Sequence, residues 1–369
     1  MHAALWQRTR LALYHDSVCF QTRTLRNHQP MRHLVLTSLC MSVFGLQVLL
    51  VSPESNAEEL SGIEFSFPRL EAAQHLLSQT DTYTNTASPF DRKVRMGVAK
   101  DPGIEKYLEF VAAQVLPWNL KDRENLQNAI KNLESPLKAL SIKLNSPVSL
   151  IHTTGKEESG AAYTRGNEIV FPKRELQGTL KAQTKLLAHE LFHVISRQHP
   201  TLRNQLYQVI GFKKANPIQL PGKLSALRIT NPDAPVIEHV MQLKLSPTQS
   251  VHIAPMLIAK SDYVENGPAS LFAYLSFKLM QVKQTSEGWN AVQENGAPIF
   301  HSPQAADFHR QIGKNTSYII HPEEILADNF ALIMTNGTII DSWLTDKMKT
   351  VMKDYFEALA KTQLTENQS

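Results

Sequence analysis

Residues 189–193 read His-Glu-Leu-Phe-His, an HExxH motif inside an apolar, helix-forming run over residues 186–195. Residues four apart share one face of a helix, so His189 and His193 can offer two imidazole nitrogens to one metal ion. Glu190 lies about 100° further around the helix, where it can reach a water molecule on the metal without being a ligand. Two histidines with a neighbouring carboxylate are the groups that zinc-assisted hydrolysis requires.

The helix predicted around this motif extends over residues 180–198, and its apolar side chains lie opposite the two histidines. They follow the spacing i, i+4, i+7, i+8, namely Leu187, Leu191, Val194 and Ile195. This spacing predicts that one face packs on a core while the other faces a site. The alternative is a buried amphipathic helix whose histidines only bond to neighbours. Burying two histidines and a glutamate is costly unless they have partners, and a metal ion is one such partner.

A catalytic zinc site needs a third protein ligand, and two residues are candidates. His199 would complete the spacing HExxHxxxxxH, but Ser196 stands where that pattern has the glycine that turns the chain back to the metal. Glu324 lies in the first turn of a helix predicted over residues 322–334 and shares a face with Asp328. Asp328 can accept the second N–H of a ligating histidine and so orient its ring. We therefore expect Glu324 as the ligand.

Other polar residues lie close to Glu324 in the sequence. Acidic residues also favour the first turn of a helix for reasons unrelated to metals, so a solvated acidic turn is the alternative. We expect Glu323, the other carboxylate of that turn, to point away from the metal. Hydrolysis also needs a donor to the developing oxyanion, for which Tyr318 is the candidate and His321 the rival.

HExxH followed by a distant ExxxD resembles the arrangement in gluzincins, the thermolysin-like zinc metallopeptidases. The remaining sequence is similar to uncharacterised exported bacterial proteins that are regarded as metallopeptidases. By position, the resemblance implies one Zn²⁺ ion on His189, His193 and Glu324, with Glu190 as general base and Asp328 orienting a histidine. The 131 residues from His193 to Glu324 are many more than in thermolysin-like enzymes. The resemblance therefore covers the metal centre and not the substrate pockets.

The same resemblance implies an α+β, zincin-like fold. Such a fold has a small mixed sheet with an edge strand above the HExxH helix, followed by a mainly helical lower subdomain, here with a β-containing insertion. The pattern predicts helices over residues 104–116, 122–144, 201–210 and 342–364, and strands over 147–152, 236–245 and 252–258. Residues 58–101 read as turn-rich, 270–282 as helix or strand, and 283–318 as mainly loop. We expect a helical region over 58–145 and a catalytic domain over 146–369.

A hairpin signature precedes the motif helix, with its turn at residues 165–167. An exposed edge strand there can bind an extended peptide through backbone hydrogen bonds. Ala161, Ala162 and Tyr163 are the predicted substrate-binding residues, because the small side chains would permit close approach. The stretch Asn231-Pro232-Asp233 reads as a simple turn.

The N-terminal 57 residues resemble an export signal. A short basic start at Met31 is followed by an apolar run over residues 34–51 and by small residues up to Ala57, where cleavage is expected. An organellar transit segment and an uncleaved membrane anchor are the alternatives, since about 18 apolar residues are just enough to span a bilayer. We expect an exported protein, periplasmic or secreted, without stable membrane insertion if the signal is removed.

Charge and cysteine content narrow the function further. Five of the 38 basic and two of the 34 acidic residues lie within residues 1–57, which leaves 33 basic and 32 acidic residues for the rest. This balance does not indicate a nucleic-acid partner. Both cysteines, Cys19 and Cys40, also lie in that segment, so the remainder has no thiolate ligand, disulfide or cysteine nucleophile. The sequence thus predicts a zinc metallopeptidase with a peptide or protein substrate. The alternatives are an exported binding protein with a structural or inactive metal site, and a zinc hydrolase of a non-peptide amide.

Overall fold

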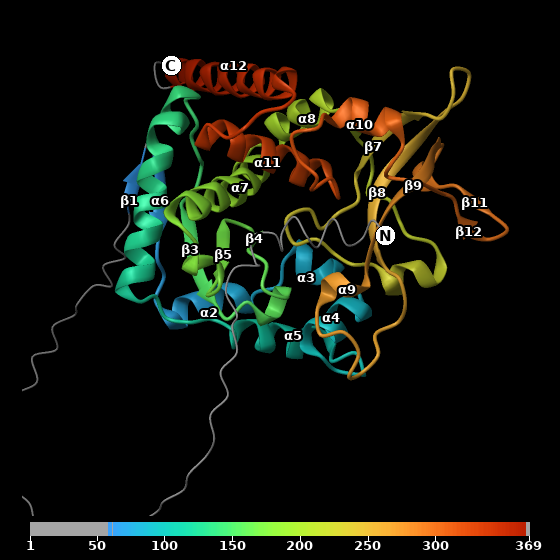
Figure 1. Ribbon diagram of the computed structural model, residues 1–369, viewed down its shortest axis with the longest axis horizontal. Helices are drawn as coiled ribbons and strands as arrows, with labels where there is room; N and C mark the ends of the chain where they lie inside the picture. The colour runs from blue at the N-terminus through green and yellow to red at the C-terminus, as the bar shows by residue number, and fades with distance from the viewer. Residues whose placement is uncertain (1–57, 61, 367–369) are drawn as a thin grey trace, which may run out of the picture. The chain divides into compact units, whose positions relative to one another are not determined.

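A five-stranded mixed sheet supports the helix that carries the HExxH motif (Figure 1). In the computed structural model, which describes residues 58–60 and 62–366, the strand order is β1-β2-β3-β5-β4. Strands β2, β3 and β5 run parallel, whereas β1 and β4 pair antiparallel at the two ends. The strands are β1 Glu58–Leu60, β2 Ile63–Ser66, β3 Val148–Thr153, β4 Tyr163–Arg165 and β5 Glu168–Pro172. Strand β4 is therefore an edge strand.

Helices cover both faces of this sheet. Side chains alternate along each strand, so Leu150 and Phe171 join the core on the side of α6 and α7, while Ile151 and Val170 join the core on the side of α2 and α5. Figure 1 shows these two helical layers on opposite sides of β3 and β5. The helices are α2 Leu70–Ser78, α5 Gly103–Ala112, α6 Leu120–Ala139 and α7 Leu180–Gln198.

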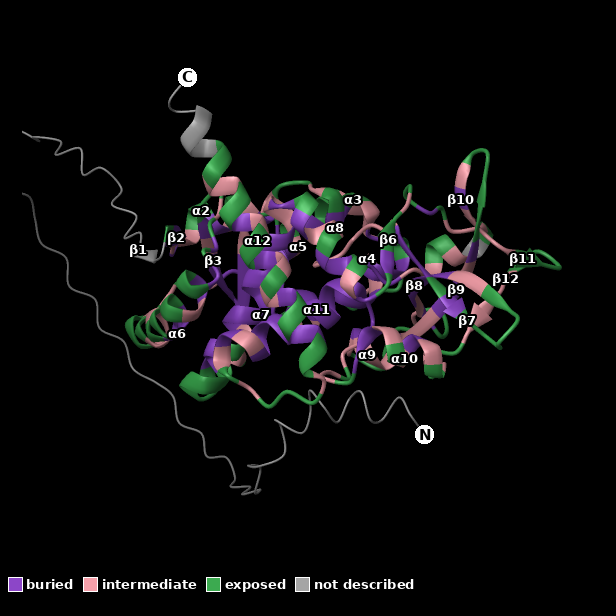
Figure 2. Ribbon diagram, turned by 90° about the horizontal axis from the view of Figure 1, so that it is seen from above, coloured by how far each residue is buried: buried purple, intermediate pink, exposed green. Residues whose placement is uncertain are grey.

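The larger core continues from α7 into the C-terminal helices α8 Pro200–Val209, α11 Pro322–Thr335 and α12 Ser342–Glu366. Helix α11 packs directly on α7, where the rings of Phe192 and Phe330 lie 5.6 Å apart. Both helices are buried over most of their length, as the purple ribbons of Figure 2 show. Polar side chains on the facing surfaces of α7 and α11 are therefore removed from water.

A second sheet lies between α8 and α11 in the sequence. Its order is β10-β9-β8-β7-β6, with β13 also on β9, and all pairs are antiparallel. The strands are β6 Phe212–Lys214, β7 His239–Lys244, β8 Ser250–Ala259, β9 Leu275–Thr285, β10 Gly288–Ala291 and β13 Phe300–His301. Strands β11 Gln293–Glu294 and β12 Ala297–Pro298 form a small hairpin. This sheet agrees with the predicted β-containing insertion, and the fold is α+β as predicted.

The ends of the two central helices follow from local chemistry. At the start of α7, the Thr179 hydroxyl accepts a hydrogen bond from the Ala182 N–H, and the helix stops where Pro200 begins α8. Helix α11 begins with Pro322, and the His321 side chain caps it by accepting the Glu323 N–H. The first turns of α7 and α11 are thus defined by residues close to them in the sequence.

Two regions contain more regular structure than their composition indicates. The stretch 58–101 contains α2, α3 Thr82–Thr86 and α4 Pro89–Met96, so the prediction of a turn-rich segment was wrong. Helices α3 and α4 are short, and each starts with a capping box, at Asp81 and Ser88. The stretch 283–318 contains the strands from β10 onward and α10 Ala306–Ile312. These strands are too short for a periodic signal and depend on their partners, since β10 and β13 pair with β9 while β11 and β12 pair with each other.

Further short helices connect the larger elements. They are α9 Leu271–Tyr274 and the 3₁₀ turns η1 Lys156–Glu158, η2 Glu175–Gln177 and η3 Gly222–Leu227. Helix α9 leads directly into β9, which resolves the ambiguous stretch 270–282 as mostly strand. Strand β2 comes from the predicted helical region and pairs with β3 of the predicted catalytic domain, so the sheet extends across residue 145.

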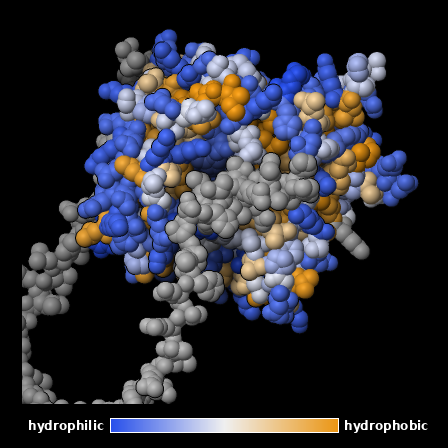
Figure 3. All heavy atoms as spheres, viewed as in Figure 1, coloured by the Kyte–Doolittle hydropathy of each residue, from blue (hydrophilic) through white to orange (hydrophobic). Residues whose placement is uncertain are grey.

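The expected start at Met31 and cleavage after Ala57 lie outside the described residues. Within residues 58–60 and 62–366, no helix combines the length and apolar character needed to cross a membrane. Large apolar side chains are exposed at separate positions such as Leu120 and Val264, and three of them lie close together in the sequence around the start of α12, namely Ile339, Ile340 and Trp343. The face seen in Figure 3 is mainly hydrophilic with scattered apolar areas.

Candidate metal centre

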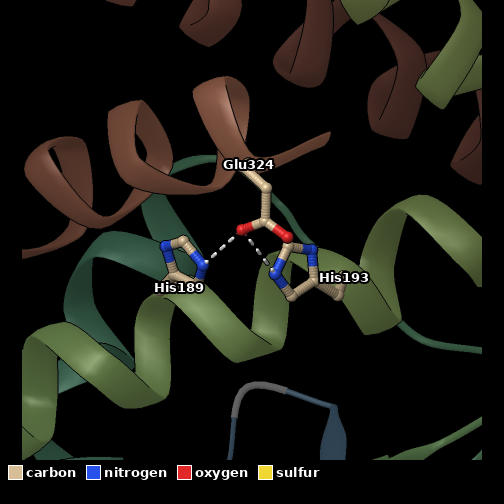
Figure 4. Close-up of side chains that lie close together, drawn as sticks. All are labelled: His189, His193 and Glu324. Carbon is tan, nitrogen blue, oxygen red and sulfur yellow. Dashed lines mark hydrogen bonds and ion pairs between the residues drawn. The ribbon is translucent and has the colours of Figure 1, made fainter. Parts of the chain in front are cut away.

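Three side chains from α7 and α11 converge in the buried layer between these helices (Figure 4). Helix α7 places His189 and His193 one turn apart, with ring centroids 4.9 Å from each other. Helix α11 places Glu324 opposite them, with Oε2 lying 3.1 Å from His189 Nε2 and 3.7 Å from His193 Nε2. The structure thus brings the three predicted ligands together, and all three are buried.

The spacing of these atoms fits a metal ion. Ligand atoms around a tetrahedral ion with bonds of about 2.0–2.1 Å lie roughly 3.3–3.4 Å apart, and the two distances at Glu324 bracket that value. The Nε2 atom of His193 is buried and has no hydrogen-bond partner. Buried nitrogens without a partner are rare in folded proteins, and this one is directed at Glu324. The three residues could therefore hold a metal ion.

His189 is oriented from its other ring nitrogen. Its Nδ1–H donates to Asp328 Oδ1 at 2.9 Å, and the second oxygen of Asp328 accepts from the Thr316 hydroxyl. This contact leaves Nε2 free to face Glu324. Burial by itself would lower the pKa of His189, but hydrogen bonds and charges of Asp328 and Glu324 raise it well above its ordinary value. A metal ion would have to displace the proton from Nε2.

His193 has a carboxylate partner that the sequence interpretation missed. Its Nδ1–H donates to Glu323 Oε1 at 3.0 Å, and Glu323 also accepts from the hydroxyls of Ser196 and Tyr207. The expectation that Glu323 points away was wrong, because the whole first turn of α11 is buried against α7 and α8. Ser196, which stands where the spacing HExxHxxxxxH has a glycine, helps to hold this carboxylate.

A third element reaches the centre from the connection between η3 and β7. The side-chain amide of Asn231 donates to Glu324 Oε1 at 2.6 Å, which leaves Oε2 for the histidines. A carboxylate oxygen of Asp233 lies within 4.8 Å of ligand atoms of both Glu190 and His193. Burial raises the pKa of Asp233, the His193 charge opposes this shift, and the nearby Glu190 adds to it. The predicted turn is present, since the Ala234 N–H donates to the Asn231 carbonyl at 3.2 Å. Its position beside the metal centre was not predicted, because no spacing in the sequence connects residues 231–233 with the HExxH motif.

Glu190 lies beside the three ligands without joining them. Its side chain is buried, and Oε2 accepts a hydrogen bond of 3.0 Å from the Thr164 hydroxyl of β4. Strand β4 therefore lies next to the centre, as expected for the edge strand above the HExxH helix. The side chains of Ala162 and Tyr163 are buried and that of Ala161 is half-buried, so their backbone is the part that a ligand could reach.

The two candidates for the oxyanion donor contact different residues. Tyr318 is half-buried, and its ring centroid lies 6.1 Å from that of His189. His321 caps α11 and packs against the Tyr207 ring, and burial lowers its pKa to about 4 despite the nearby carboxylates. Tyr318 is thus adjacent to a predicted ligand, whereas one nitrogen of His321 is occupied by the backbone.

His199 does not reach the ligand set. It lies at the C-terminal end of α7, where Nε2 bonds to the Lys143 carbonyl at 2.8 Å and Nδ1 lies 3.2 Å from the Tyr355 hydroxyl. Its ring packs between the aromatic side chains of α12. His199 therefore connects α7 with α12.

Comparison with known proteins gives one similarity. A family model described as "eCIS core domain" matches residues 152–201, which run from the end of β3 through β4, β5 and α7. The matched stretch contains His189, Glu190 and His193 and stops well before Glu324. No curated protein and no solved structure matches the chain. The chain is therefore similar to this domain over the sheet edge and the HExxH helix.

Proposed function

We propose that this protein is a zinc metallopeptidase of the gluzincin type with a zincin-like catalytic domain. The observation that carries the proposal is the meeting of His189, His193 and Glu324 with an unpartnered buried nitrogen aimed at their common centre. A set of two histidines and one glutamate is the donor set of catalytic zinc sites that keep an open position. The arrangement of sheet, edge strand and HExxH helix supports the same class.

The residues around the centre have distinct roles in this proposal. His189, His193 and Glu324 would hold the ion, while Asp328 and Glu323 orient the two rings. A zinc ion bound there supplies Lewis-acid polarisation of a carbonyl and lowers the pKa of water.

Peptide hydrolysis would then depend on two further groups. Glu190 accepts a proton from the attacking water and passes it to the leaving amine. The Tyr318 hydroxyl donates to the developing oxyanion. The substrate backbone would lie along β4, beside residues 161–164.

Export to the periplasm or the medium is part of the proposal, and the signal-like pattern before residue 58 supports it. A binding protein with a closed metal site is the second candidate, favoured by the position of Asp233 beside His193. An amide other than a peptide bond is a further possible substrate of the same chemistry, and a digest of mixed substrates distinguishes the two.

The test measures zinc content and peptide cleavage by the purified protein, with and without a chelator. We expect about one zinc ion for each chain and cleavage that the chelator abolishes. The variant Glu190→Gln should retain zinc and cleave roughly 100- to 10,000-fold more slowly. The exposed Glu357 of α12 provides the matched control, Glu357→Gln. Unchanged cleavage by Glu190→Gln would refute the mechanism.

A further inference from the structure

Residues 228–233, here called the strap, cross from the second sheet to the metal centre. At its start, Arg228 bridges to Ile258 of β8, and the Ile229 N–H donates to the Leu257 carbonyl at 3.0 Å. At its end, Asn231 and Asp233 lie beside the HExxH helix. The strap therefore begins as part of the insertion and ends in the site.

The middle of the strap is fastened by buried charged groups of α4. The Thr230 N–H lies 3.1 Å from both oxygens of Asp91, and Arg95 donates to the Thr230 carbonyl at 3.0 Å. Arg95 in turn forms ion pairs with Asp91 at 2.5 Å and with Glu158 at 2.9 Å. Because these groups are buried and mutually bonded, the strap is held in one position.

Asp233 occupies the free edge of β4. The Thr164 N–H donates to Asp233 Oδ1 at 2.7 Å, so this N–H group points away from the partner strand β5. Arg197 contacts the Thr164 carbonyl at 3.5 Å and the Asp233 carbonyl at 3.3 Å. The outward-facing backbone groups of Thr164 are those that an added peptide strand would need, and both already have partners.

The same residue also faces the reacting groups. The carboxylate of Asp233 lies within 4.8 Å of Glu190, the general base of the proposed reaction, and of the proposed ligand His193. The strap thus makes both kinds of contact that a bound peptide would make. The Asp233 side chain accepts a hydrogen bond from the edge strand and lies beside the general base.

We propose that the strap is an intramolecular occupant of the substrate position, and that Asp233 keeps the site closed to peptides until the strap is displaced. This inference rests on the proposed function, because it assumes a peptide site along β4. The strap is bonded to Asp91 and Arg95 of α4, so in this proposal the region before residue 145 holds the strap in place.

The test compares the wild-type protein with Asp233→Ala, using Asp262→Ala as the matched control at an exposed aspartate of the same insertion. Two readouts require no turnover: amide hydrogen exchange over residues 161–166, and the affinity of the zinc-loaded protein for acetohydroxamate. Loss of the hydrogen bond between the Thr164 N–H and Asp233 corresponds to roughly a two- to tenfold change in an equilibrium, the range of an ordinary protein hydrogen bond. We expect Asp233→Ala to speed exchange and to strengthen probe binding by that factor.

Peptide cleavage by Asp233→Ala should rise in parallel. The strap proposal would be overturned if amide exchange stays the same and probe binding is unchanged or weaker. A fall in peptide cleavage would also overturn it, because Asp233 would then take part in catalysis. Asp233→Asn retains the size and one acceptor, so it should show a smaller increase and guards against misfolding of the alanine variant. If exchange and probe binding increase but no variant cleaves any peptide, the strap does cover β4 and the metal position, and the failure lies in the peptidase proposal and in peptide as the ligand.

Discussion

The substitution Glu323→Gln tests whether the Glu323 side chain contacts His193, as in the structure, or points away from the metal, as expected from the sequence. Glu323 is 2 % exposed, and it accepts hydrogen bonds from His193 Nδ1 and from two hydroxyls. Glutamine has the same shape. Its carbonyl oxygen can accept from His193 and Ser196, and its amide can donate to the Tyr207 oxygen. The substitution therefore removes the charge and leaves the packing.

The size of the effect follows from the contact between Glu323 and His193. A hydrogen bond to a charged group contributes about 1.5–3 kcal/mol, compared with about 1 kcal/mol for a neutral pair. Loss of the charge should therefore weaken zinc binding through His193 by about 0.5–2 kcal/mol, which is roughly a two- to thirtyfold lower affinity. A residue that pointed into solvent would produce no such change.

Zinc affinity is measured by competition with a chromophoric chelator, and melting of the metal-free protein checks the fold. Glu357→Gln on the exposed face of α12 is the control, and it should bind zinc as the wild type does. An affinity of Glu323→Gln within twofold of the wild-type value, with an intact fold, would refute the reasoning. The carboxylate would then contribute nothing to the His193 ligand.

Two further predictions concern the ligand set and a buried acid. Bound zinc should be lost in Glu324→Ala and kept in His199→Ala. The His199→Ala variant should instead melt at a lower temperature, because His199 connects α7 with α12. Loss of zinc in His199→Ala alone would contradict the proposed ligands. Burial raises the pKa of Glu157 from 4.5 to about 7, although the Thr153 hydroxyl opposes the shift. The folded state therefore disfavours the ionised form of Glu157. The unfolding free energy of the wild type should fall by roughly 3 kcal/mol between about pH 4.5 and pH 7 because of this one group, and the loss stays constant at higher pH. The unfolding free energy of Glu157→Gln minus that of the wild type should therefore rise between about pH 4.5 and pH 7. Denaturant titrations at several pH values measure this difference, and a difference that does not change with pH would contradict the prediction.

Local patterns carried much of the prediction. The apolar spacing around His189 and His193 predicts helix α7 and the face that the two histidines share, because residues four apart meet on one side of a helix. The same geometry joins Glu324 with Asp328 on α11. Such features depend on neighbours within one or two turns, so a single sequence contains them.

Other features depend on which segments meet in space. Glu323 faces His193 because α11 packs on α7 through its first turn, and no spacing within α11 distinguishes an inward from an outward Glu323. The short helices before residue 101 and the strands after β9 are set by caps and pairing partners, since their own periodic signal is too brief.

The strap shows the same division most clearly. From the sequence alone, Asn231 and Asp233 read as a turn, and the HExxH motif reads as half of a metal site. Only the tertiary structure places those two residues against Glu324 and the edge strand β4, through anchors on α4 that are more than a hundred residues away. The sequence by itself determined which residue types could bind a metal and on which helices they lie. The packing of distant segments decided which of these residues meet and placed the strap beside them, because contacts across a buried interface depend on the fold of the whole chain.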